Sequence, residues 1–114
     1  MGQFLLNFHH FPLPKNVVPT EAEFEAINKQ WQDYIGGIAG QGKFVGTQRL
    51  DQEGTIIGPD GKLSNAVTDG KGLVVGTLTI EADSLDEAVE LSKGCPVLAM
   101  GGSVEVRPVL AFDV

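Results

Sequence analysis

Two adjacent histidines, His9 and His10, are the residues of this chain best suited to acid–base chemistry. An imidazole titrates near neutral pH, so a histidine in a cleft can take up and release a proton. Both end a segment of alternating apolar residues, and neighbours in a strand point to opposite faces, so the two cannot bind one metal ion together. We expect His9 to share a face with Asn7 and to be the acid–base candidate. The pattern alone favours the alternative, a histidine held by hydrogen bonds at a strand end.

Polar residues that could bind a ligand recur at alternate positions of the later apolar segments. Thr77 lies in one such segment, and Glu105 and Arg107 lie two apart in the last one. Side chains two apart in a strand share a face, so Arg107 could hold a carboxylate through two hydrogen bonds. The alternative, which we favour, is that Arg107 pairs with an acid on a neighbouring strand, such as Glu81. The candidate ligand-binding residues are therefore Asn7, Thr77, Glu105 and Arg107.

The other motifs indicate neither a cofactor nor a metal site. Cys95 is the single cysteine, so no internal disulfide can form, and its position before Pro96 indicates a small buried side chain. Two histidines on opposite faces and one cysteine do not make a zinc site. Gly101-Gly102 lacks the spacing and the following helix of a phosphate-binding loop. We expect no cofactor and no metal.

The elements that would position these residues follow the order β-α-β-β-β-α-β. Helices are predicted after capping boxes at Thr20 and Ser84, and glycines end both of them. Residues 55–58 could extend the second strand beyond a bend. With that strand merged, this is a ferredoxin-like split βαβ fold of the α+β class, one domain over residues 1–114 with two helices on one face of an antiparallel sheet. Alternation and turn residues predict strands over 3–11, 43–50, 63–68, 73–82 and 103–109.

Alternation also predicts which sheet face the helices cover. Phe4, Leu6 and Phe8, with the even positions from 74 to 82, should pack on the helices, including Leu85, Ala88 and Val89 of the second helix. The other face is too mixed for a core and too apolar at its edges to be fully solvated. We expect two such faces to pair in a homodimer. The predicted open face carries Leu5, Asn7, His9, Thr77, Thr79, Glu81, Glu105 and Arg107.

Composition narrows the class of protein and of partner. The chain has 114 residues, 42% of them hydrophobic, which suits one globular domain. Its formal net charge is -7, and its few basic residues are scattered, so we expect no nucleic-acid partner. No apolar run approaches the length of a membrane span, and the first residues do not resemble a signal peptide. We expect a cytoplasmic protein that does not associate with membranes.

Several segments resemble the YCII-related family, and within it the branch named for a DGPF tetrapeptide. The most specific is residues 101–109, GGSVEVRPV, and others are VTDG at 67–70, SLDEA at 84–88 and GCP at 94–96. The resemblance implies a dimeric α+β barrel and a catalytic His-Asp pair, which makes Asp69 a candidate partner for His9. The alternative is that Asp69-Gly70 is simply a tight turn between two apolar segments. The chain differs from the DGPF pattern at Lys71-Gly72, which stand in place of Pro-Phe, and it has no histidine on the first predicted helix.

Two functional hypotheses follow from these features. The first is a YCII-like homodimer that binds a small, possibly anionic organic molecule in the dimer cleft. Acid–base catalysis there would use His9 to move a proton, Asp69 to orient it and Arg107 to hold an anionic group. The alternative is a non-enzymatic module that senses a ligand or binds a transcription regulator. A polar cavity at His9 would favour the first hypothesis, and an exposed apolar patch would favour the second.

Overall fold

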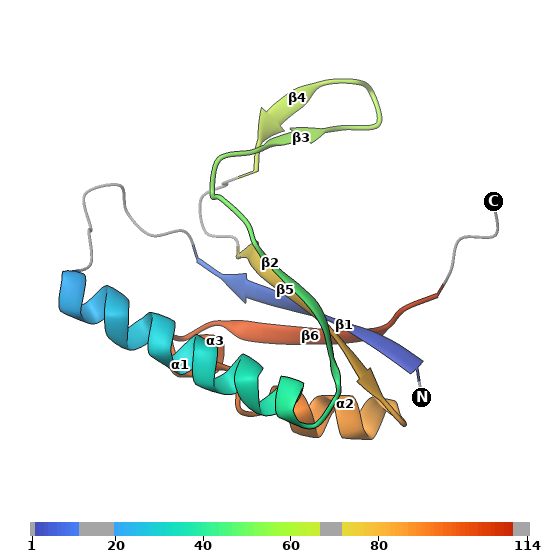
Figure 1. Cartoon of the computed structure of the whole chain (residues 1–114). Coiled ribbons are helices and arrows are strands. Elements are labelled where there is room, and N and C mark those ends of the chain that lie inside the picture. The colour runs from blue at the N-terminus through green and yellow to red at the C-terminus, as the bar shows by residue number, and fades with distance from the viewer. Residues whose placement is uncertain (1, 12–19, 67–71, 111–114) are drawn as a thin grey trace.

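The computed structural model describes residues 2–11, 20–66 and 72–110. Four strands form the main antiparallel sheet in the order β2-β5-β1-β6 (Figure 1). Two further strands form a small sheet of their own. The elements along the chain are β1 (Gly2–His10), α1 (Glu21–Gly40), β2 (Phe44–Arg49), β3 (Thr55–Ile57), β4 (Leu63–Asn65), β5 (Leu73–Ala82), α2 (Leu85–Ser92), α3 (Pro96–Ala99) and β6 (Ser103–Pro108).

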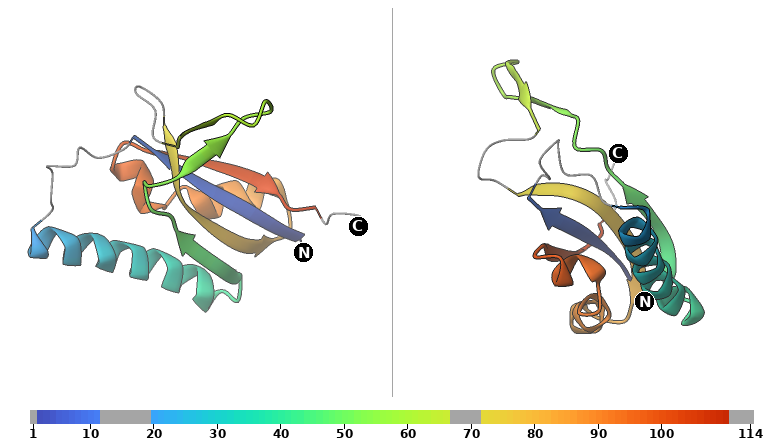
Figure 2. Two further views of the ribbon diagram at one scale, coloured as in Figure 1. Left: turned by 90° about the horizontal axis from the view of Figure 1, so that it is seen from above. Right: turned by 90° about the vertical axis from the view of Figure 1, so that its left-hand side faces the viewer.

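The predicted α+β class and the ferredoxin-like arrangement are confirmed for the main sheet. β1 pairs antiparallel with β5 on one side and with β6 on the other, and β2 pairs with the far side of β5. All three helices lie on one side of this sheet, and the other side carries no helix among the described residues (Figures 1 and 2). We call the uncovered side the open face.

The central part of the prediction is wrong. Residues 55–57 do not extend β2 within the sheet. They pair with β4 instead, so that Thr55 stands opposite Asn65 and Ile57 opposite Leu63. The β3–β4 hairpin projects from the sheet on the side away from the helices, as two views agree (Figures 1 and 2). The predicted turn at Asp69-Gly70 lies outside the described residues.

The core lies where alternation placed it, between the sheet and the helices. Phe4, Leu6 and Phe8 of β1 are buried, and so are Leu78 and Ile80 of β5. The partly buried Trp31 and Tyr34 of α1 pack on this cluster, and the Trp31 ring lies 5.1 Å from that of Phe8. Burying these side chains is the main stabilising contribution to the fold, at about 1.5–3 kcal/mol for each large aliphatic or aromatic residue.

A β-bulge changes the predicted facing of one residue. The pairing of β1 with β5 shifts between Phe8 and His9, so His9 stands opposite Val74 and not opposite Val75. Val74 was predicted to face the helices. The extra residue in β5 instead turns Val75 toward the core and places Val74 across from His9. The bulge therefore changes which β5 side chains lie beside the two histidines at this end of the sheet.

The helix caps are confirmed, with different partners for the acidic residues. The hydroxyl oxygens of Thr20 and Ser84 accept hydrogen bonds from the amides three residues ahead, as capping predicts. The Glu87 carboxylate accepts from the Asp83 amide at 3.3 Å and from Lys43 Nζ at 2.7 Å. The Lys43–Glu87 ion pair links the residue before β2 to α2.

The second helix buries a narrower face than predicted. Ala88 is fully buried and Leu91 packs on the core, but Leu85 and Val89 are exposed. Beyond α2, Pro96 does more than prevent its return. It occupies the first turn of a separate short helix, α3, a position that suits proline because its missing N–H group is not needed there. The first residues of α3 are buried.

Candidate functional site

The open face brings four of the predicted site residues together across two strand pairs. Asn7 of β1 stands opposite Thr77 of β5 and opposite Glu105 of β6. His9, two residues along, stands opposite Ser103. Residues paired in this way share a face, so the predicted facing of these side chains is confirmed.

One carboxylate oxygen connects the polar side chains of this cluster. Asn7 Nδ2 donates to Glu105 Oε1 at 3.3 Å, and His9 Nε2 lies 3.9 Å from the same oxygen. The pair is partly exposed, with 35% of the His9 side chain and 52% of the Glu105 side chain accessible. The 3.9 Å separation of His9 Nε2 from the Glu105 carboxylate is longer than a hydrogen bond, so both groups can offer polar atoms to a ligand. The arrangement can therefore hold a proton, deliver it, or bind a polar group of a ligand.

An open hollow of about 470 Å³ adjoins this cluster at the end of the sheet. Its volume falls within the range of small-molecule sites, at about 300–1,000 Å³. His9 and Glu105 contribute polar side chains to its lining, and Phe11 contributes an exposed aromatic ring. The remaining lining comes from His10, Gly72 and residues 101–104.

His10 fastens the wall of the hollow. Its Nε2 lies 2.7 Å from the carbonyl oxygen of Met100, and its Nδ1 lies 2.7 Å from that of Phe11. The contact with Met100 ties the end of β1 to the segment that follows α3. Gly102 completes the wall by close approach, since a Cβ there would lie 2.5 Å from the His9 carbonyl oxygen.

The remaining predicted site residues lie apart from this cluster or outside the described residues. Arg107 stands opposite Leu5, and Glu81 stands opposite Gln3. The expected Arg107–Glu81 pair is therefore wrong: Arg107 takes part in no ion pair within 4.0 Å in the described part of the chain. Asp69 lies outside the described residues.

The sequence did not identify Ser103 or the anchoring role of His10. Ser103 lies opposite His9 and lines the hollow. The glycine pair before Ser103 was the available signal, because glycine permits close backbone approach. The contact of His10 with Met100 joins residues far apart in the sequence, and no local pattern reports it.

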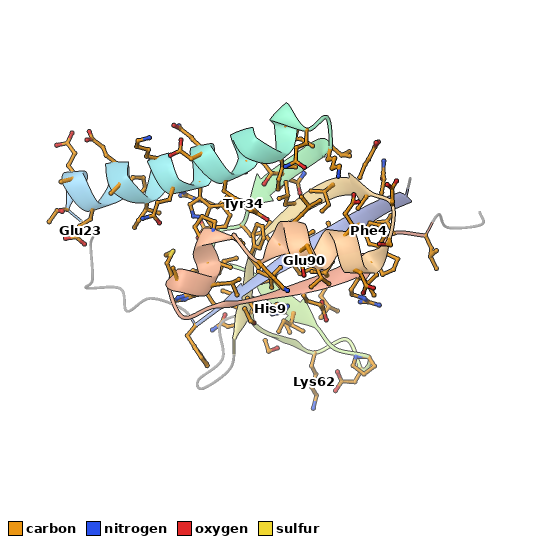
Figure 3. The ribbon with its side chains drawn as sticks, turned by 90° about the horizontal axis from the view of Figure 1, so that it is seen from below. Phe4, His9, Glu23, Tyr34, Lys62 and Glu90 are labelled. Atoms are coloured by element: carbon orange, nitrogen blue, oxygen red, sulfur yellow. The ribbon has the colours of Figure 1, made fainter. Side chains whose placement is uncertain are left out.

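Cys95 is the small buried residue that the sequence predicted. It is 2% exposed, and burial raises the pKa of its thiol to about 11. The thiol is therefore protonated at neutral pH and is a poor nucleophile. Tyr34 lies close by, between α1 and α2 (Figure 3). Its hydroxyl donates to the carbonyl oxygen of Leu91 at 2.8 Å, and burial raises its pKa.

The described residues offer neither a metal-binding cluster nor a membrane-spanning helix. Within residues 2–11, 20–66 and 72–110, no group of three or more His, Cys, Asp or Glu side chains could hold a metal ion. No helix in the same part of the chain is long and apolar enough to cross a membrane.

The fold and the hollow define a small ferredoxin-like α+β domain whose sheet is covered by helices on one face only. A family model of the YCII-related domain matches residues 15–113. The chain belongs to the YCII-related family. The match begins after β1, so it does not extend to Asn7 or His9. No curated protein matches the chain.

Proposed function

We propose that this chain forms a homodimer through its open faces and binds a small organic molecule in the hollow beside His9 and Glu105. The observation that carries the site is the shared Glu105 oxygen, which contacts Asn7 and lies 3.9 Å from His9. Any catalysis there is acid–base chemistry, in which His9 moves the proton. Glu105 takes the orienting role that the family resemblance assigned to Asp69.

The dimer is supported by the dimensions of the subunit. The subunit exposes 8146 Å², whereas a folded monomer of 12.1 kDa exposes about 6,000 Å². Its radius of gyration is 15.8 Å, against about 13 Å for a compact domain of this length. The excess area is similar to that which one subunit buries in an obligate dimer, at about 1,000–2,500 Å².

The ligand that suits the hollow is small, with an aromatic or aliphatic part and at least one polar group. Phe11 offers apolar surface, and His9 and Glu105 offer a donor and an acceptor. Arg107 lies one step further along the same face of β6, where it could attract an anionic group that extends beyond the hollow. Thr77 offers a hydroxyl opposite Asn7.

Thermal-shift screening with small organic acids, phenols and lactones tests this proposal. A ligand that binds only the folded state raises Tm. We expect hits with the wild type whose shift is lost in His9→Ala and Glu105→Gln and retained in Thr79→Ala, an open-face control that does not line the hollow. Hits that shift all four proteins alike would remove the site. Wild-type turnover of a discovered substrate by His9→Ala would remove the catalytic role and leave a binding module.

A further inference from the structure

The β3–β4 hairpin carries large aliphatic side chains into solvent. Ile57 is 73% exposed and Leu63 is 69% exposed. These two residues are Cα partners across the hairpin, so their side chains lie next to each other on one face. We call this pair the apolar tip. Ile56 points to the other face of the hairpin, with Ser64 as its partner.

The hairpin is held in shape by its own hydrogen bonds. The Gly58 amide donates to the Lys62 carbonyl at 2.8 Å, and the Ala66 amide donates to the Gly54 carbonyl at 3.0 Å. The turn between the strands requires Gly61, whose φ is +81°. A two-stranded hairpin alone is marginally stable in water. A pair of bulky aliphatic residues exposed on this hairpin therefore indicates a surface that gains stability from a partner.

The position of the hairpin identifies the side from which that partner comes. It rises on the open-face side of the sheet, away from the helices (Figures 1 and 2). It also follows the end of β2 and precedes β5, which is the end of the sheet where the hollow lies. A molecule seated on the open face would therefore meet both the apolar tip and the hollow.

The chain itself offers an apolar surface that matches the tip. After β6, Val109 is exposed and Leu110 is 86% exposed. The Val109 amide donates to the Gln3 carbonyl at 2.9 Å, at the start of β1, whereas the hairpin follows the end of β2 at the other end of the sheet. A two-fold axis between two open faces can bring the hairpin end of each subunit over the far end of the other. The apolar tip of each subunit would then cover Val109 and Leu110 of the other, and the two-fold axis would repeat this contact.

We propose that the β3–β4 hairpin is a dimerisation arm whose apolar tip packs on a second copy of this chain. This role rests on the face-to-face dimer proposed above, and it assigns the hairpin as an element that contacts the second subunit. The second copy is the occupant that the observations favour, because the excess surface of the subunit matches the area that a stable dimer buries.

Sedimentation equilibrium of the full chain tests the arm. The double variant Ile57→Ser/Leu63→Ser removes the apolar tip, and Ile56→Ser is the control on the other face of the same hairpin. We expect a wild-type dimer, a dimer Kd raised by about hundredfold or more in the double variant, and a change below about tenfold in Ile56→Ser. Thermal unfolding of the double variant checks that the main body is still folded.

A photo-crosslinking measurement covers the case in which the double variant fails to fold. A benzophenone amino acid in place of Leu63 in the otherwise unchanged chain should give a covalent product of twice the 12.1 kDa subunit mass on irradiation. The arm would be overturned, and the face-to-face dimer retained, by either of two results. In one, the double variant dimerises as tightly as the wild type; in the other, the wild type is a dimer but position 63 gives no crosslink. A wild-type monomer at 100 μM would overturn both.

Discussion

The two faces of the main sheet are made by the same strands and have opposite physical characters. On the covered face, Leu6, Leu78 and Ile80 have no accessible surface. On the open face, Asn7, His9 and Glu105 are partly or largely exposed, and Asn7 and His9 both lie near one Glu105 oxygen. The alternation separates two tasks along one backbone: every second side chain stabilises the fold, and those between them are available for binding.

The largest expected effect is on the covered face. Leu78→Ala should lower the free energy of unfolding by about 2–5 kcal/mol, because it leaves a cavity among fully buried neighbours. Its neighbour Thr79 lies on the open face, and Thr79→Ala should change that free energy by less than about 1 kcal/mol. Urea unfolding at one protein concentration measures both. Equal losses in the two variants would contradict the division between the faces.

A smaller effect is expected at Gly102, where the segment before β6 approaches β1 and α3. A Cβ there would lie 2.5 Å from the His9 carbonyl oxygen and 2.6 Å from Val97 Cγ2, so Gly102→Ala should cost about 1–3 kcal/mol of stability through forced displacement. The control is Gly37→Ala in α1, where no atom lies within 4 Å and helix propensity should give a gain of up to about 1 kcal/mol. Urea unfolding distinguishes the two signs. A more stable Gly102→Ala variant would show that the residues around Gly102 can shift without cost to make room for the methyl group.

The smallest effect concerns the ion pair that joins the helix layer to the edge strand. The hydrogen bond from Lys43, with that from the Asp83 amide, lowers the pKa of Glu87 from its ordinary 4.5. This contribution is present above about pH 4.5 and is lost as the pH falls through the folded-state pKa. Glu87→Gln should therefore reduce stability at pH 7 and flatten its decline below pH 4.5. Thermal unfolding from pH 7 to pH 3 measures this, and parallel pH curves would exclude a role for the pair.

Sequence patterns predicted the main strands, the caps and the core because each depends on local periodicity. The alternation from Gly76 to Ala82 matches the observed burial residue by residue. The bulge at Phe8 and His9 was missed because register depends on the partner strand, which a local pattern does not contain. The same limit explains the wrong pairing of Arg107 with Glu81.

The hairpin and the site show a second limit of local patterns. Residues 55–65 have short apolar runs around Pro59-Asp60-Gly61, which fit either an extension of β2 or a separate hairpin, and only the three-dimensional pairing decides between them. In the site, Asn7, His9 and Glu105 could be assigned to one face. Their convergence on one carboxylate oxygen follows from the pairing of β1 with β6, not from any spacing along the chain.

The attachment of the hairpin has an evolutionary consequence. It joins β2 to β5, which are antiparallel neighbours, so their ends stay adjacent whatever connects them. Its length and sequence can drift without disturbing the core, since loop length changes the free energy of closure only slowly. Under the dimerisation role proposed above, duplicated genes that keep the same sheet and hollow while their hairpins diverge would give products that assemble with their own kind and not with each other.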